Sequence, residues 1–317
     1  MVLVLFACST PETAPAPADE SAASDGALDP APYLLDDTAA AAAPALDAEE
    51  VAEAIGASIE AVLALDPVHL ADAYEGIWAG RDEDCPYYYP EYLELYDQYI
   101  WTDSCTSDQG YRFDGYAYYM AYHGYVGSYY TYDRYFYLYT SSMSIADPAG
   151  ESLTGSGYAY YYDIDYWYYG YRAGYGLIQG TFDWEGPSYQ DSWLSRRLSV
   201  DLAVASTYYP AGYRYLSLNG SLGDVSETVT AVNFDSVYLE SANTGTACGL
   251  EPSGSIRVRD AEGTWYEVAF DGPAYSGATS FPAHCDGCGD VWWRGENLGV
   301  ACPDFSALVS WESDPWH

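Results

Sequence analysis

The segment Leu198-Ser-Val-Asp-Leu-Ala-Val-Ala205 decides the fold class, because apolar residues alternate with small or polar ones throughout it. A period of two places its Leu and Val residues on one face of a half-buried β-strand. Shorter stretches repeat the pattern further along the chain. These stretches contain Leu216 and Leu218, Val237 and Leu239, Ile256 and Val258, and Val268 and Phe270.

Turn sequences separate the alternating stretches, and no helical pattern lies between them. Strands that follow one another through short turns pair as antiparallel hairpins. We therefore expect a mainly β fold, an antiparallel up-and-down meander that forms a sandwich, an open barrel or a long curved sheet. The expected turns are His123-Gly124, Asp147-Pro-Ala-Gly150, Pro210-Ala-Gly212, Asn219-Gly220 and Asp260-Ala-Glu-Gly263.

A short amphipathic α-hairpin is expected ahead of the strands, over residues 47–78. Asp47 is a good N-cap, and Glu50 is placed to complete a capping box. Asp66-Pro67 separates two helical stripes, which we expect to pack on the sheet formed by the β-rich part, residues 79–317. The stripes are Val51, Ile55, Ile59, Val62 and Leu63, then Leu70, Ala73, Tyr74, Ile77 and Trp78.

The net charge of the chain excludes polyanions such as nucleic acid as partners. Its 48 acidic residues stand against ten arginines and no lysine, which gives a formal net charge of −38. Such a polyanion repels nucleic acid and anionic lipid head groups, because binding phosphates requires Lys and Arg. We expect no nucleic-acid partner.

The N-terminal segment points to export and lipid anchoring. Residues 1–7 are apolar, and Leu5-Phe-Ala-Cys8 resembles the bacterial lipobox, which implies lipid transfer to the Cys8 thiol and attachment to a membrane. Residues 9–46 consist mostly of Ala, Pro, Ser, Thr and acids with one aromatic residue, and such a composition favours a disordered stalk. Its root-mean-square reach would be roughly 35 Å. We expect an exported lipoprotein, periplasmic or on the cell surface, with one domain over 47–317.

The six cysteines of the body favour an oxidising compartment and three disulfides. Cys85 and Cys105 flank an aromatic segment and should pair with each other. A hairpin centred on Gly295 would place Trp292 opposite Leu298 and Cys288 opposite Cys302, which leaves Cys248 for Cys285. The rival interpretations are a zinc site built from the last four cysteines and a redox disulfide in Cys285-Asp-Gly-Cys288.

The 37 tyrosines have a structural and a functional interpretation. Tyr suits a pleated surface, and cross-strand Tyr pairs stabilise neighbouring strands, so structural ladders are one explanation. The other is an aromatic platform for sugar rings, with Asp side chains holding their hydroxyls. The best patch by alternation is Tyr161, Asp163, Asp165, Trp167 and Tyr169.

Motifs of the common enzyme classes are absent from the sequence. There is no GxSxG elbow, HExxH, Walker loop or dinucleotide fingerprint, so we assign no catalytic residue and no metal ligand. Acidic pairs such as Asp163 with Asp165, or Asp183 with Glu185, could serve a surface-anchored hydrolase. We expect no cofactor, although calcium held by loop carboxylates is an alternative.

Two sequence regions resemble those of a group of bacterial proteins. They are Trp101-Thr-Asp-Ser-Cys105 followed by Phe113-Asp-Gly115, and Cys285-Asp-Gly-Cys288-Gly followed by a Trp-rich strand and Gly299-Val-Ala-Cys302. Over residues 75–305 the chain is similar to uncharacterised, Cys-containing β lipoproteins of GC-rich, myxobacterial-type bacteria. The resemblance implies location and architecture but no activity. The expected function is a non-enzymatic envelope lipoprotein that binds or organises extracellular material, glycan included.

Overall fold

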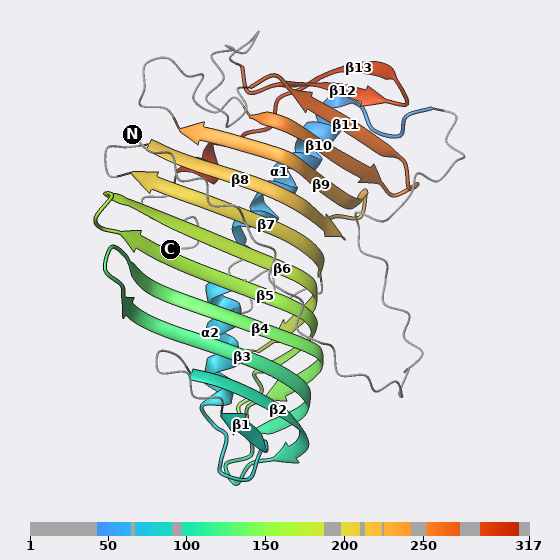
Figure 1. Cartoon of the computed structure of the whole chain (residues 1–317). Helices are drawn as coiled ribbons and strands as arrows, with labels where there is room; N and C mark the ends of the chain where they lie inside the picture. Colours follow the sequence, from blue (N-terminus) through green and yellow to red (C-terminus); the bar gives the residue numbers. More distant parts are fainter. Residues whose placement is uncertain are drawn as a thin grey trace, which may run out of the picture.

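One antiparallel sheet of thirteen strands dominates the structure, a computed structural model that describes residues 43–64, 67–90, 97–186, 198–209, 213–223, 225–241, 252–272 and 286–310 (Figure 1). Each strand pairs with the next one in the chain, which confirms the up-and-down meander. Because β1 and β13 lie at its two edges, the sheet is open, and of the three forms expected it is the long curved sheet. The strands are β1 (Tyr88–Pro90), β2 (Asp97–Thr106), β3 (Arg112–Val126), β4 (Thr131–Ala146), β5 (Ser152–Tyr166), β6 (Tyr171–Glu185), β7 (Leu198–Tyr209), β8 (Tyr213–Gly223), β9 (Val229–Ser241), β10 (Ser253–Asp260), β11 (Trp265–Phe270), β12 (Gly289–Trp293) and β13 (Glu296–Ala301).

Two helices, α1 (Ala48–Ala64) and α2 (Pro67–Trp78), cover one face of the sheet, which curls around them (Figure 1). α1 packs on β9, β10 and β13, whereas α2 packs on β4, β5 and β6. The helices therefore follow one another across the strands instead of folding back as the expected hairpin. The predicted stripes are the buried sides of both helices, because each stripe is covered by a different part of the sheet.

The predicted capping box begins α1. Asp47 Oδ1 accepts the backbone N–H groups of Glu49 and Glu50 at 3.0 Å, and Glu50 Oε2 accepts the N–H of Asp47 at 2.9 Å. Two residues ahead of Asp47 also contact the domain, because the N–H groups of Ala45 and Leu46 both donate to the hydroxyl of Tyr266. The described part of the domain therefore includes the last residues of the segment that the sequence assigns to the stalk.

An aromatic core joins the end of α2 to the first strands. Trp78 packs edge-on against Phe113 with the ring centroids 6.0 Å apart, and stacks near Trp101 at 6.4 Å. The Arg81 guanidinium lies 4.6 Å from the Trp78 ring centroid and forms a cation–π contact with it.

Charged residues also fasten α2 to β4. Arg134 on β4 forms ion pairs with Asp72 at 2.6 Å and with Glu75 at 3.6 Å. Glu75 also accepts the Tyr119 hydroxyl at 2.5 Å. α2 is thereby fixed by apolar packing and by a polar network together.

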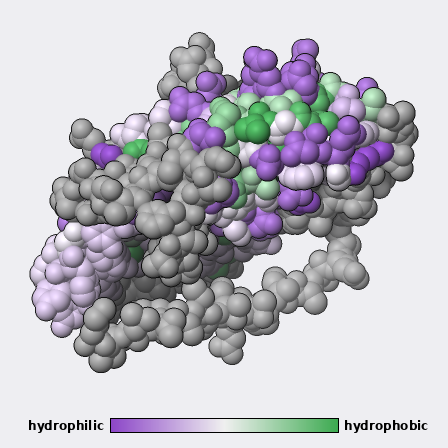
Figure 2. Space-filling model, turned by 90° about the horizontal axis from the view of Figure 1, so that it is seen from above, coloured by the Kyte–Doolittle hydropathy of each residue, from purple (hydrophilic) through white to green (hydrophobic). Residues whose placement is uncertain are grey.

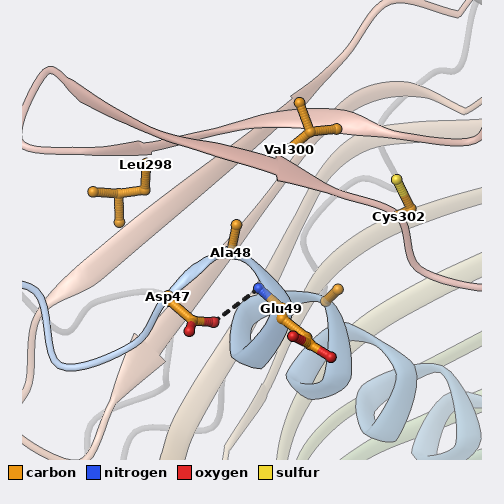
Figure 3. Close-up of a pocket in the computed structure, with 7 residues that line it drawn as sticks. Asp47, Ala48, Glu49, Leu298, Val300 and Cys302 are labelled. Carbon is orange, nitrogen blue, oxygen red and sulfur yellow. Dashed lines mark hydrogen bonds between the residues drawn. The ribbon is translucent and has the colours of Figure 1, made fainter.

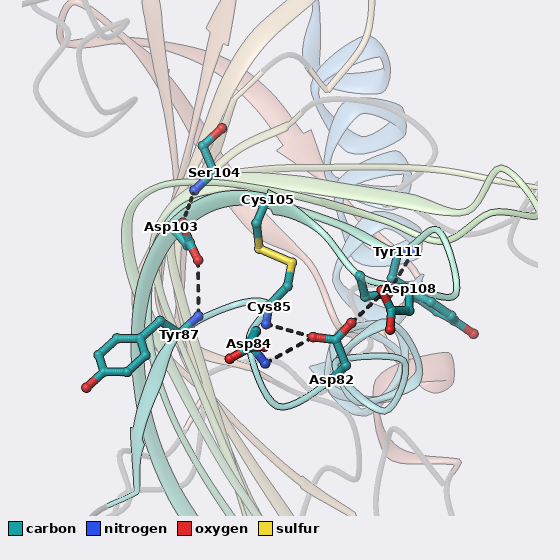
Figure 4. The surroundings of a disulfide bond; sticks show 10 residues. Asp82, Asp84, Cys85, Tyr87, Asp103, Ser104, Cys105, Asp108 and Tyr111 are labelled. Carbon is teal, nitrogen blue, oxygen red and sulfur yellow. Dashed lines mark hydrogen bonds between the residues drawn. A yellow bond between two sulfur atoms is a disulfide. The ribbon is translucent and has the colours of Figure 1, made fainter.

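Two disulfides of the expected set are present in the described residues. Cys85–Cys105 ties the loop after α2 to β2, and Asp82 organises this loop by accepting backbone N–H groups of Asp84, Cys85 and Asp108 (Figure 4). Cys288–Cys302 joins the chain on either side of the β12–β13 hairpin. Both pairings are confirmed, whereas Cys248 and Cys285 lie outside the described residues. With Cys288 and Cys302 joined, these two sulfurs cannot act as zinc thiolates.

The β12–β13 hairpin departs from the expected register at one point. Asp290 lies opposite Val300 as predicted, but Trp292 lies opposite Asn297 and not Leu298. A bulge between the two pairs absorbs the extra residue, while Arg294 and Gly295 form the turn with positive φ angles.

Some of the five expected turns lie between strands as predicted, and others lie inside strands. Asp147–Gly150 and Asp260–Gly263 are turns, whereas residues 210–212 are outside the described chain. His123-Gly124 is not a turn, since β3 continues to Val126 and the reversal follows at residues 127–130. Asn219-Gly220 lies within β8, where Gly220 has a φ of +116° at a β-bulge. A glycine at positive φ occurs in some β-bulges as well as in type I′ turns, which explains the false signal.

Neither helix in the described part of the chain has the length and apolar character that crossing a bilayer requires.

Candidate functional site: a tyrosine face with a polar groove

The face of the sheet opposite the helices carries an array of tyrosines over β3–β6, here called the tyrosine face. Strand alternation presents these residues away from the core, and cross-strand register aligns them in rows. One row runs Tyr122, Tyr135, Tyr162 and Tyr175 across four strands. The tyrosine face comprises Tyr118, Tyr122, Tyr135, Tyr137, Tyr139, Tyr158, Tyr160, Tyr162 and Tyr175.

The rings of the tyrosine face pack mostly edge to face, the arrangement that their quadrupoles favour. Tyr118 and Tyr137 have centroids 5.3 Å apart at an interplanar angle of 89°, and Tyr135 meets Tyr160 at 5.3 Å and 83°. Tyr122 and Tyr135 instead stack at 4.4 Å and 6°. Structural ladders therefore account for much of the tyrosine content.

Mutual packing raises the pKa of several of these phenols. Burial, reinforced by repulsion from the phenolate forms of Tyr158 and Tyr118, raises the pKa of Tyr137 to about 12. Burial likewise raises the pKa of Tyr122 and of Tyr160, with neighbouring tyrosines adding to the effect. At physiological pH the surface thus offers aromatic rings and neutral hydroxyl groups.

Two adjacent register rows of this face carry no charged residue between β3 and β8, although the chain holds 48 acids. At β7 and β8 the large rings give way to small or polar side chains, so the surface steps down beyond Tyr175. The rows are Tyr122, Tyr135, Tyr162, Tyr175, Ala205 and Ser217, and Met120, Tyr137, Tyr160, Leu177, Ala203 and Asn219.

A groove of about 470 Å³ occupies this step, a volume in the range of small-ligand sites. Tyr215 is half-buried in its wall and stacks on the buried Tyr238, with centroids 6.1 Å apart and an angle of 21°. The polar groups are hydroxyls and one amide, and none of the lining residues is charged. The groove is lined by Ala205, Thr207, Tyr215, Leu216, Ser217, Asn219, Ser236, Tyr238 and Ser253.

Two β-bulges shape the groove. The register shifts between Leu218 and Gly220 on β8, and again between Ser253 and Ser255 on β10. Asn219 then spans the gap, because its Oδ1 accepts the N–H of Ser236 at 3.0 Å while its Nδ2 donates to Ser217 Oγ at 3.3 Å. The polar groups are thus held in place by bonds within the sheet.

The patch singled out from the sequence does not form one exposed face. Tyr161 and Asp163 lie on the helix-covered side of β5, with 0% and 2% of their surface exposed. The Asp163 carboxylate pairs with Arg172, which also binds Asp133 at 2.5 Å. Asp165 is half-buried at the end of β5, opposite Arg172.

The other two residues of that patch, Trp167 and Tyr169, lie in the β5–β6 turn and are exposed by 51% and 62%. The alternation that linked the five residues ends at Tyr166, where the strand ends. A buried, paired Asp163 is also unsuited to act with Asp165 as an acid–base pair. Asp183 and Glu185 lie on β6, away from the groove.

A second hollow, of about 510 Å³, lies between the start of α1 and the edge strand β13 (Figure 3). Leu298 and Val300 form its apolar side, and the Asp47 and Glu49 side of the helix faces them. The Asp47 carboxylate is engaged in capping the helix. Seen from above, apolar residues gather among hydrophilic ones at this end of the molecule, where Val300 and Trp292 are exposed (Figure 2).

Within the described residues, no group of three or more His, Cys, Asp or Glu side chains is arranged to hold a metal ion.

No protein-family model, no curated protein and no solved structure matches this chain.

Proposed function

We propose that this chain is a non-enzymatic, exported lipoprotein of the bacterial envelope whose groove binds uncharged glycan. The observation that carries the glycan part is the groove itself, which combines the Tyr215 ring with hydroxyl and amide groups and contains no charged residue. Sugars present apolar ring faces and hydroxyl edges, so they match a site of this composition.

The overall charge narrows the ligand class. At −38 the protein repels acidic polysaccharides as it repels nucleic acid, which leaves neutral sugars as the partners that can approach. The tyrosine face continues the groove over β3–β6 with further neutral rings. A polymer lying across the strands would therefore meet the groove first and the tyrosine face beyond it.

Location is proposed from the disulfides and the N-terminal segment together. Cys85–Cys105 and Cys288–Cys302 suit an oxidising, extracytoplasmic compartment. Cys8 is the proposed lipid-attachment site, which would anchor the domain to the membrane on the acidic stalk.

The test is binding to immobilised oligosaccharides of glucose, galactose, mannose and N-acetylglucosamine, with uronic-acid oligosaccharides as the charged comparison. We expect binding to at least one neutral series and none to the charged series. Tyr215→Ala should weaken that binding at least tenfold, about 1.4 kcal/mol, whereas Tyr215→Phe should retain most of it. Tyr87→Ala is the matched control, because Tyr87 is 55% exposed at the far edge of the sheet.

Failure of every neutral series to bind would refute the glycan proposal. Release of shorter products from a bound oligosaccharide would instead establish the hydrolase alternative. In that case Asp183→Asn and Glu185→Gln would show whether this acidic pair on β6 is responsible.

A further inference from the structure

Two neighbouring hairpins of the sheet end in exposed hydrophobic residues, four of them aromatic. The β3–β4 hairpin carries Val126 and Tyr129, exposed by 68% and 52%, and the β5–β6 turn carries Trp167, Tyr168 and Tyr169, exposed by 51%, 62% and 62%. Tyr129 and Tyr168 touch, with ring centroids 5.1 Å apart, so the two hairpin ends form one surface. We call these five residues the aromatic tips.

The aromatic tips are free of charge. Residues 126–130 and 166–171 contain only Val, Gly, Ser, Tyr and Trp, in a chain whose net charge is −38. The nearest charged pair is Asp165 with Arg172, which lie opposite each other one register position below Tyr166 and Tyr171. Arg172 is also paired with Asp133 and Asp163, so the base of the tips carries one guanidinium and three carboxylates, Asp165 included, and the charges lie below the aromatic residues.

We propose that the aromatic tips insert into the interfacial region of a zwitterionic lipid bilayer. Tyr and Trp favour this region, because one end of each side chain is apolar and the other forms hydrogen bonds. The β5–β6 turn is compact, because the N–H groups of Tyr169 and Gly170 both donate to the Tyr166 carbonyl oxygen, so its exposed rings lie just beyond the ends of the two strands. Segments that bind at the interface enter a membrane only to about 5–10 Å, so a shallow tip of this kind suffices.

Shape and charge favour a bilayer over other partners. The tips protrude from the end of the sheet, whereas a saccharide site is normally concave. The many acids of the chain oppose approach to anionic lipid, so the lipid class selected is zwitterionic. This contact is independent of the glycan site and of the Cys8 anchor, and would orient the sheet end-on to the membrane.

The experiment is co-sedimentation of the full chain carrying Cys8→Ser with phosphatidylcholine vesicles. The Cys8→Ser change removes any lipid anchor from the measurement. We expect binding that persists in high salt, because burial of aromatic surface is not screened by ions. Vesicles rich in phosphatidylglycerol should bind at least fivefold less protein at low salt.

The triple variant Trp167→Ser, Tyr168→Ser, Tyr169→Ser should bind phosphatidylcholine vesicles at least tenfold more weakly. Its matched control is the double variant Tyr87→Ser, Trp292→Ser, which removes exposed rings elsewhere on the molecule. Brominated phosphatidylcholine should quench fluorescence in the parent, and Trp167→Phe should remove most of that quenching. Circular dichroism verifies that each variant is folded.

Equal binding of the triple variant and the parent, or no binding of the parent to phosphatidylcholine, would overturn the proposal. Loss of neutral-glycan binding in the triple variant, without any vesicle binding, would assign the tips to the glycan site instead. Loss of vesicle binding with glycan binding intact would support the membrane contact alone.

Discussion

The Trp101 indole N–H donates to the Tyr74 hydroxyl at 2.8 Å, in a contact between β2 and α2 where both side chains are fully buried. The bond joins the sheet to its covering helix at the aromatic core. Burial raises the pKa of Tyr74 well above its ordinary value, so the hydroxyl remains protonated.

Tyr74→Phe should therefore destabilise the domain by about 1–3 kcal/mol, because it leaves the buried indole N–H without an acceptor. Urea unfolding followed by circular dichroism gives the free-energy change. Tyr87→Phe, at an exposed position, serves as the control and should change stability by less than about 0.5 kcal/mol. A Tyr74→Phe variant as stable as the parent would show that the bond is not a net stabilising contact.

Gly220→Ala should destabilise the protein by about 2 kcal/mol or more, since φ is +116° and an added Cβ would lie 1.9 Å from the Asp201 carbonyl oxygen. Gly76→Ala is the opposite case. Gly76 lies in the exposed side of α2 with no atom within 4 Å of an added Cβ, so this change should stabilise by about 0.5–1 kcal/mol. Thermal and urea unfolding of the two variants measure the expected loss of stability for Gly220→Ala and the expected gain for Gly76→Ala.

Raising the pH into the alkaline range should lower the free energy of unfolding, because tyrosines of the tyrosine face have raised pKa values in the folded protein. Folded Tyr137 ionises near pH 12, whereas an unfolded tyrosine ionises near pH 10. Between these values the folded state binds more protons than the unfolded state, so the free energy of unfolding falls as pH rises. Absorbance at 295 nm should show a group of tyrosines that titrates late, and Tyr160→Phe should reduce the pH slope of stability. A single transition near pH 10 for all 37 tyrosines of the folded protein would contradict this prediction.

Removing either described disulfide should cost stability. Cys85–Cys105 closes a loop of 20 residues and Cys288–Cys302 one of 14, so each double Cys→Ala variant should lose about 3 kcal/mol. Unfolding under non-reducing conditions measures the loss of stability.

Peptide mass spectrometry of the unreduced parent should also show Cys248 linked to Cys285. Free thiols at those two positions would disprove the third pairing.

Lipid attachment at Cys8 is tested in a bacterial host. The parent should partition into the detergent phase of Triton X-114 and incorporate labelled palmitate, and Cys8→Ser should do neither. Aqueous partition of the parent would remove the anchor from the proposed function and leave the compartment, which also rests on the disulfides.

The antiparallel meander could be predicted because alternation and turn residues act locally, although His123-Gly124 and Asn219-Gly220 lie inside strands. The face of the sheet on which each tyrosine lies could not be predicted. Tyr161 and Tyr162 have the same side chain, and only the packing of α2 on one side of β5 makes the first a core residue and the second a surface residue. Tyrosine suits both positions, so the sequence pattern alone leaves the two faces equivalent.

The groove was also beyond prediction, because it depends on register. Ala205, Ser217 and Tyr238 are distant in sequence and meet only because β7, β8 and β9 pair as they do. The one local signal was Asn219-Gly220, which indicated positive φ but not whether the chain would turn or bulge. Likewise Asp66-Pro67 marked the end of α1 without fixing the angle to α2.

The placement of α1 has a consequence for how the protein is made. This helix precedes every strand in the chain, yet it packs on β9, β10 and β13, which are synthesised last. A chain that leaves the ribosome or an export channel N-terminus first therefore presents an uncovered apolar helix while the meander grows strand by strand. The domain can complete its fold only after the final hairpin has emerged, and until then the apolar side of α1 lacks the strands that bury it.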